Sequence, residues 1–120
     1  MYKLLFVLLS FSILIGCTKK IDLDDFDQER WKNDTNGCLG ERAQMVEELR
    51  AAKPKILGLY QKSVIKVLGR PEQEELYKRS QTYYIYAIDP SKDCDEPNSD
   101  PRFLRIRFTS LGIANEVNIR

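Results

Sequence analysis

Histidine is missing from all 120 residues of the chain. Its absence excludes Ser-His and Cys-His nucleophile pairs, histidine-ligated zinc, and the side chain that ordinarily titrates near neutral pH. The sequence also lacks a glycine-rich phosphate loop and a Cys-x-x-C pair, which argues against nucleotide hydrolysis and thiol oxidoreductase chemistry. We therefore predict that the protein is not an enzyme and that it holds no metal or cofactor. An enzyme would need a pocket with converging titratable groups.

The sequence has no apolar run long enough to span a bilayer. The apolar stretch from Leu4 to Ile15 ends after twelve residues, whereas a spanning helix needs about 20. One positive charge, Lys3, precedes this stretch. A charged start followed by a short apolar core is typical of a secretory signal.

The end of that signal carries a recognisable pattern, Leu14-Ile15-Gly16-Cys17. It resembles the lipobox of bacterial lipoproteins, in which the cysteine receives a diacylglycerol and the chain is cut before it. The resemblance implies a signal peptide over residues 1–16 and a lipid anchor on Cys17, made of diacylglycerol and an N-acyl group. Two or three acyl chains give stable anchoring where one is marginal. The alternative is an ordinary signal peptide in which Cys17 is incidental.

A strong net charge is also missing. Lys3 is the only charged residue among residues 1–16, so the remainder holds 18 basic and 18 acidic residues. This balance gives no general attraction to nucleic acid. We expect the partners to be the membrane, through the anchor, and other envelope proteins, with the outer membrane as the location.

Cysteine is scarce, and its count is informative. If Cys17 carries lipid, only Cys38 and Cys94 remain, in a compartment where disulfides persist. We predict a Cys38–Cys94 bridge around a loop of about 57 residues, worth roughly 3–4 kcal/mol in the chain-entropy model. The alternative is two reduced, buried thiols.

The polar stretch after the lipobox predicts a tether over residues 17–26, with a domain over residues 27–120. Four acidic side chains in this region are expected to stay in solvent: Asp22, Asp24, Asp25 and Asp27. Phe26 and Trp31 stand in polar surroundings, so both are expected to dock on the core. Residues 33–37 read as a loop.

Two helices are predicted next. Apolar residues recur at three- and four-residue spacings over Gly40 to Lys53, and Pro54 is expected to end that helix. The second helix runs from Gln61 to Leu68 and is capped by Gly69.

The remainder of the chain predicts strands. Residues 82–88 are dense in aromatic and β-branched side chains, and residues 103–108 alternate strictly between apolar and polar. A shorter strand is expected at 75–78 before a turn, a long loop at 89–102, and a last strand at 113–119 with Val117 and Ile119 inward. The sequence therefore predicts an α+β domain, with two helices on one face of a three- to four-stranded antiparallel sheet.

Residues 57–120 resemble the BamE/SmpA-like domain of outer-membrane assembly lipoproteins. The resemblance rests on the helix that ends in Leu68-Gly69-Arg70-Pro71, on Tyr83-Tyr84-Ile85-Tyr86, and on the closing pair of alternating strands. It implies a non-catalytic accessory protein in outer-membrane protein assembly or envelope integrity. The chain departs from the family in its N-terminal extension, in its cysteine pair, and in Tyr60, which stands where an oxygen-bearing helix cap is usual. No partner-binding residue is carried over for that reason.

The outward face of the sheet is a candidate binding surface. Tyrosine and arginine are enriched at binding hot spots, and five such residues are candidates: Tyr77, Tyr83, Tyr86, Arg105 and Arg107. The interpretation that we favour from the sequence alone is that the tyrosines cover the core and the arginines are ordinary strand exteriors. Small α+β domains of this kind also act as enzyme inhibitors, so the alternative function is a tethered inhibitor or ligand-binding module.

Overall fold

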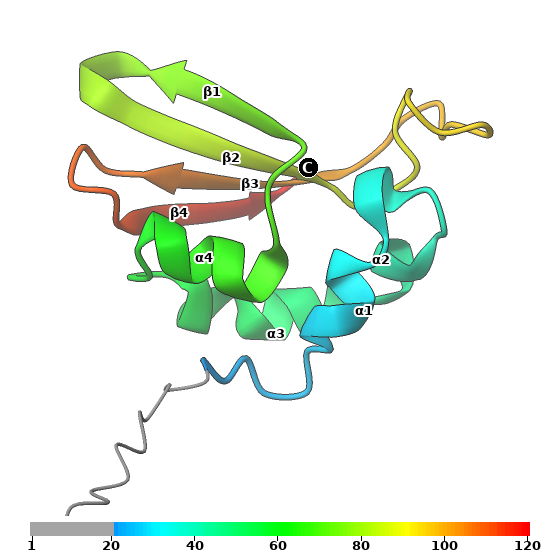
Figure 1. The fold of residues 1–120 in the computed structure, drawn as a ribbon, viewed down its shortest axis with the longest axis horizontal. Coiled ribbons are helices and arrows are strands. Elements are labelled where there is room, and N and C mark those ends of the chain that lie inside the picture. The colour runs from blue at the N-terminus through cyan, green and yellow to red at the C-terminus, as the bar shows by residue number, and fades with distance from the viewer. Residues whose placement is uncertain (1–20) are drawn as a thin grey trace, which may run out of the picture.

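The computed structural model describes residues 21–120, which form a helical layer on one face of a four-stranded antiparallel sheet (Figure 1). The helices are α1 (Gln28–Lys32), α2 (Glu41–Gln44), α3 (Val46–Ile56) and α4 (Gln61–Leu68), with short 3-10 turns η1 (Thr35–Gly37) and η2 (Lys78–Ser80). The strands are β1 (Gln73–Tyr77), β2 (Gln81–Ala87), β3 (Phe103–Phe108) and β4 (Ala114–Ile119). The predicted α+β class is confirmed, and the described helical layer holds four helices rather than two.

The sheet follows the chain order β1-β2-β3-β4. In β3, Leu104, Ile106 and Phe108 are fully buried against the helices, while the intervening arginines are half-buried on the other face. This alternation is what the sequence of β3 predicts. The pairing of β3 with β4 puts Val117 opposite Ile106 on the helix side, where it is buried.

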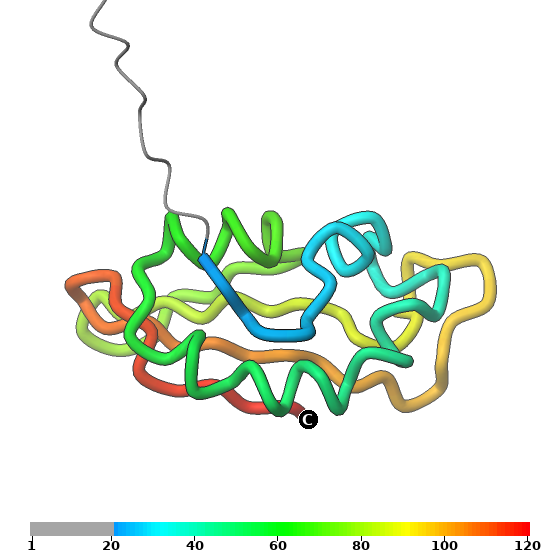
Figure 2. Tube along the Cα trace, turned by 90° about the horizontal axis from the view of Figure 1, so that it is seen from below, coloured from blue at the N-terminus to red at the C-terminus, as the bar shows by residue number. Residues whose placement is uncertain are grey.

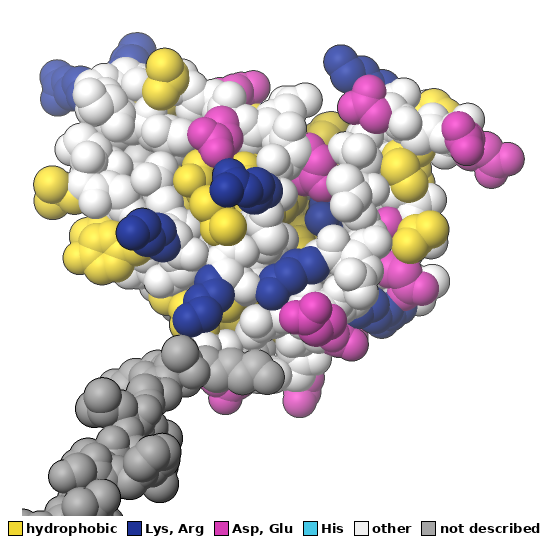
Figure 3. Space-filling view, viewed as in Figure 1, with side chains coloured by type: hydrophobic (Ala, Val, Ile, Leu, Met, Phe, Trp, Pro, Cys, Tyr) yellow, Lys and Arg dark blue, Asp and Glu magenta, His cyan; other side chains and the backbone are white. Residues whose placement is uncertain are grey.

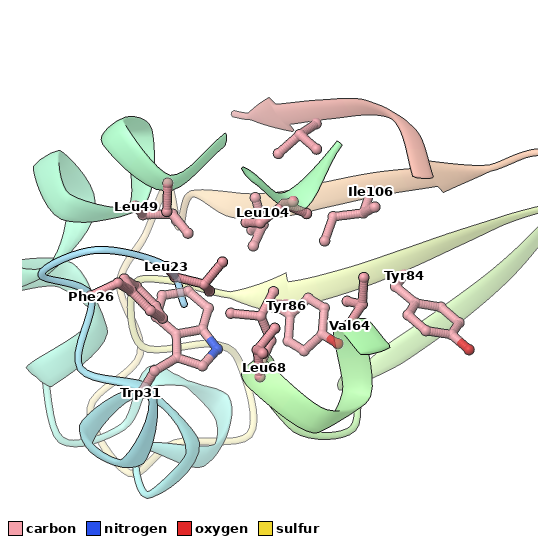
Figure 4. Close-up of a cluster of buried hydrophobic side chains, with 14 of the residues drawn as sticks. Leu23, Phe26, Trp31, Leu49, Val64, Leu68, Tyr84, Tyr86, Leu104 and Ile106 are labelled. Carbon is pink, nitrogen blue, oxygen red and sulfur yellow. The ribbon is translucent and has the colours of Figure 1, made fainter. Parts of the chain in front are cut away.

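Aromatic side chains fill the centre of the core (Figure 4). The ring centroid of Trp31 lies 5.6 Å from that of Phe26 and 6.3 Å from that of Tyr86. Trp31 and Tyr86 have no exposed surface, and Phe26 is 5% exposed. The prediction that Phe26 and Trp31 dock on the core is confirmed.

The chain reaches the core before the predicted domain start. Residues 21–27 run across the outside of the helical layer (Figure 2), and Leu23 is buried there with 1% of its surface exposed. The four aspartates of this region are exposed as expected, and Asp24 lies 2.6 Å from the ammonium group of Lys55. The apolar side chains of this segment therefore pack, while its acids face solvent.

The first predicted helix is wrong in two respects. It is split at Met45, whose φ of −100° and ψ of 9° separate α2 from α3, and Pro54 lies inside α3 rather than after it. Proline removes one backbone hydrogen bond and disfavours the helical conformation of the residue before it. Ile56, beyond the proline, is fully buried; this burial offsets the cost, and the helix continues for two residues past the proline.

The second helix matches its prediction at both ends. α4 spans Gln61–Leu68, and Gly69 follows with a φ of 78° that suits glycine. Tyr60 supplies no side-chain hydrogen bond to the helix start, as its lack of a carboxylate, amide or short hydroxyl side chain implies.

The signal peptide, Cys17 and the first part of the predicted tether lie outside the described residues. In the described part of the chain, no helix combines the length and apolar character that a membrane crossing requires.

Candidate functional site

All four helices lie on one side of the sheet, so the opposite side, which we call the outer face, is without a helical cover (Figure 1). The strand register places Glu75 opposite Tyr83, and Tyr83 opposite Arg107. Four of the five predicted surface residues lie on this face: Tyr77, Tyr83, Arg105 and Arg107.

Tyr86 was wrongly predicted to belong to this surface. Its side chain points into the core, without exposed surface, and its hydroxyl donates a hydrogen bond to the carbonyl oxygen of Gly69 at 2.8 Å. Burial raises the pKa of the Tyr86 hydroxyl far above its usual range. Tyr86 is therefore a structural residue that ties the sheet to the end of α4.

Tyr83 is the centre of a compact cluster on the outer face. Its ring meets that of Tyr77 edge-on, with centroids 5.5 Å apart and planes at 79°. The guanidinium carbon of Arg105 lies 5.1 Å from the Tyr83 ring centroid. Edge-to-face rings and a cation over a ring are both attractive arrangements. They hold the three side chains in a fixed relation before any partner arrives.

Acidic neighbours orient both arginines. Arg105 lies 3.5 Å from a Glu75 oxygen, and Arg107 lies 2.9 Å from a Glu116 oxygen. The side chains of both arginines retain 28–30% of their surface. Such part-exposed pairs contribute little to stability, but they hold the two guanidinium groups on the outer face, where their remaining donors can contact a partner.

A pocket of about 260 Å³ adjoins this cluster at the far end of β2. Its floor is apolar and includes Ile85, Ala87 and Phe103, and its rim is polar and includes Lys92 and Asp93. Ile85 is only 3% exposed although it lies on the outer face. Ser91, Lys92, Asp93 and Pro101 of the loop at residues 89–102 line the same pocket, so the outer face ends in a hollow rather than a flat edge.

A disulfide and an ion pair fix that loop. Cys38 and Cys94 are bridged, with Cα atoms 5.4 Å apart, consistent with the pairing expected from the cysteine count. Asp89 accepts two hydrogen bonds from the guanidinium of Arg102, at 2.8 and 3.0 Å. These bonds hold the pKa of the Asp89 carboxyl below its usual range. The ion pair therefore closes the base of the loop, and the disulfide holds its interior.

A buried charge network lies behind the pocket, and sequence reasoning missed it. The Glu72 carboxylate pairs with Arg42 and accepts the backbone N–H groups of Asn36 and Ala87, at 2.9 and 3.2 Å. Asp34, fully buried, accepts the N–H groups of Leu39 and Arg42. No local motif marks these residues, because each of their partners is distant in sequence or belongs to the backbone.

Within residues 21–120, no three His, Cys, Asp or Glu side chains lie close enough together to hold a metal ion. Comparison with protein-family models, with characterised proteins and with solved structures returns no match to the chain. The assignment of a function therefore rests on the residues themselves.

Proposed function

We propose that the protein is a lipid-anchored envelope lipoprotein that binds another envelope protein, without catalysis, through its outer sheet face. The proposal includes an anchor on Cys17 and an accessory role in outer-membrane protein assembly or envelope integrity, as the BamE/SmpA-like sequence pattern implies. The observation that carries the binding role is the Tyr77–Tyr83–Arg105 cluster, held in order on a face without helices and next to an apolar pocket. Rigid aromatic and arginine side chains are the usual anchors of protein interfaces.

The start of the described chain supports this assignment of faces. The described chain starts on the side of the helical layer that faces away from the sheet (Figures 1 and 2). Cys17 precedes Ile21 by four residues, which span at most about 14 Å when extended. A lipid on Cys17 within this reach of Ile21 would leave the outer face directed away from the bilayer, which supports the use of that face for binding.

Affinity purification from native membranes tests the binding role. The full chain should recover barrel-assembly components, and the double variant Tyr83→Ala/Arg105→Ala should lose most of that recovery. Lys62→Ala/Lys66→Ala is the matched control, because it removes two exposed side chains from α4 in the opposite layer. Equal recovery by both variants, or recovery of a soluble periplasmic enzyme instead, would contradict the proposal. The second outcome would favour the tethered-inhibitor alternative.

A separate experiment tests the anchor. Cys17→Ser should release the protein from membranes into the soluble fraction, because no acyl chain can then be attached. A variant that still sediments with membranes would refute the lipid anchor, whatever the outer face binds.

A further inference from the structure

The free edge of the sheet at β1 carries a second interaction surface, distinct from the outer face. β1 is paired only with β2, and within the described residues its other side has no hydrogen-bonded neighbour. All five residues of β1 are exposed. Edge strands present unpaired N–H and C=O groups, so they accept a further strand unless something blocks them.

The side chains of β1 do not block it. Leu76 points to the helix side of the sheet, but no helix reaches it, and it is 89% exposed. Figure 3 shows separate hydrophobic side chains interspersed with Lys and Arg at the end of the molecule where the β1–β2 hairpin lies. A solvent-exposed leucine in a free edge strand favours contact with an apolar side chain opposite it.

Charges on either side of Leu76 specify what can pair with this edge. Glu74 precedes it by two residues, and Lys78 follows it by two, at the start of η2. Neither forms an ion pair within residues 21–120. An antiparallel partner must therefore offer an acid opposite Lys78, an apolar residue opposite Leu76, and a base opposite Glu74. Read in its own chain direction, that partner has the pattern acid-x-apolar-x-base.

Residues 74–78, Glu-Glu-Leu-Tyr-Lys, have this pattern themselves. We propose that β1 pairs with β1 of a second copy of the chain, in an antiparallel register centred on Leu76, and joins two sheets into one of eight strands. A two-fold axis normal to the sheet leaves each face on its own side, so one residue of β1 must lie opposite itself. When that residue is Leu76, Glu74 of each copy lies opposite Lys78 of the other.

The other two-fold registers are less favourable. Centring on Glu75 puts two like charges directly opposite each other, which is destabilising. Centring on Tyr77 leaves little strand to pair, because Arg79 and Ser80 have left-handed φ values of 59° and 62° and interrupt the extended edge. The Leu76 register puts no like charges opposite each other, and four of its five residues, 74–77, lie in β1, with Lys78 as the first residue of η2.

A five-residue edge buries less than the roughly 1,000 Å² that a stable interface requires. We therefore expect a weak dimer, best detected by cross-linking the full chain in its native membranes. Leu76→Cys should form an intermolecular disulfide under mild oxidation. Directly opposite residues of an antiparallel pair have Cα atoms about 4.5–5.5 Å apart, which is within disulfide range.

Controls define the register. Glu74→Cys alone should not cross-link, because in this register its two copies lie about 13 Å apart along the strands. Membranes containing both Glu74→Cys and Lys78→Cys chains should cross-link. Leu111→Cys, also highly exposed at 79% but in the β3–β4 turn, measures random collision, and the parent chain measures any contribution of its own cysteines.

Charge reversal tests the complementarity. On the Leu76→Cys background, Glu74→Lys should lower the cross-linking yield roughly 2- to 30-fold, because two symmetric opposite-charge pairs become like-charge pairs. Adding Lys78→Glu should restore it. The proposal is overturned if Leu76→Cys links no better than Leu111→Cys, if Glu74→Cys links to itself, or if the double reversal fails to restore the yield. Cross-linking of Leu76→Cys to a different protein would show another occupant of the edge and would also overturn it.

Discussion

Replacement of Arg42 by methionine should be among the most destabilising single substitutions in the described chain. The guanidinium donates to the carbonyl oxygens of Trp31 and Ala87, at 2.9 Å each, and pairs with Glu72. It also lies 4.6 Å from the centroid of the Trp31 ring. Only 3% of the Arg42 side chain and 13% of the Glu72 side chain are exposed. Arg42 therefore joins α2, the end of α1 and the end of β2 from one buried position.

The expected loss of stability follows from this burial. Removing one partner of a buried ion pair leaves an uncompensated charge and costs about 3–5 kcal/mol. Methionine replaces most of the apolar volume, so the loss comes from the unpaired carboxylate and the two carbonyl groups. A loss of this size is a large part of the roughly 5–15 kcal/mol that stabilises a typical domain.

Chemical denaturation of the full chain, with its disulfide intact, measures this loss. Trp31 is the only tryptophan, so its fluorescence reports on the core that Arg42 contacts. Arg30→Met is the matched control, because Arg30 pairs with Glu41 on the surface, where the two side chains are 38% and 40% exposed. An exposed pair contributes about 0–1 kcal/mol. If Arg42→Met costs no more than Arg30→Met, the buried network does not hold the layers together.

Three further substitutions probe the fixed loop and the turn beneath it. The double variant Cys38→Ser/Cys94→Ser should lose about 3–4 kcal/mol of unfolding free energy in denaturant titrations, because the unfolded chain is no longer closed into a loop; an unchanged midpoint would contradict this. Asp89→Asn should destabilise the protein at neutral pH by about 1–2 kcal/mol. Because folding lowers the pKa of Asp89, its contribution is full above its unfolded pKa of about 3.9 and disappears as the pH falls through the lower folded value. The difference in unfolding free energy between Asp89→Asn and the parent chain should therefore disappear in acid. A difference that persists there would exclude the ionised carboxylate as its source. Gly37→Ala should lower the melting temperature, since a Cβ atom at this φ of 69° would lie 2.7 Å from the carbonyl oxygen of Ile88; a neutral result would mean that the turn can shift.

Much of the fold is predictable from the sequence because its signals are local. The glycine cap and the amphipathic pattern of Gln61–Leu68 predict where α4 begins and ends. The alternation of Phe103–Phe108 predicts the bounds of β3 and which of its faces is buried. The break at Met45 and the continuation past Pro54 depend on tertiary contacts, namely the burial of Met45 and Ile56. No pattern within the helix itself reports those contacts.

The buried network could not be predicted for a related reason. Arg42 and Glu72 are 30 residues apart, and the atoms that satisfy them include four backbone groups. Charged residues are mostly exposed, so Arg42 on a short helix and Glu72 before a strand both read as ordinary surface residues. Only the packing of α2 against the start of the sheet brings them together.

The error at Tyr86, by contrast, was avoidable. Side chains alternate between the two faces of a strand, so residues three apart, such as Tyr83 and Tyr86, point to opposite sides. The spacing alone excludes a surface that contains both. What the sequence could not settle is which of the two is outward, because a shift of one residue in the pairing exchanges the faces. The register settles it: Tyr84 lies opposite the buried Ile106, and Tyr83 lies opposite Arg107. The proposed binding face therefore depends on how β2 pairs with β3, because a slip of one residue would have turned Tyr86 outward beside the arginines and put Tyr83 in the core.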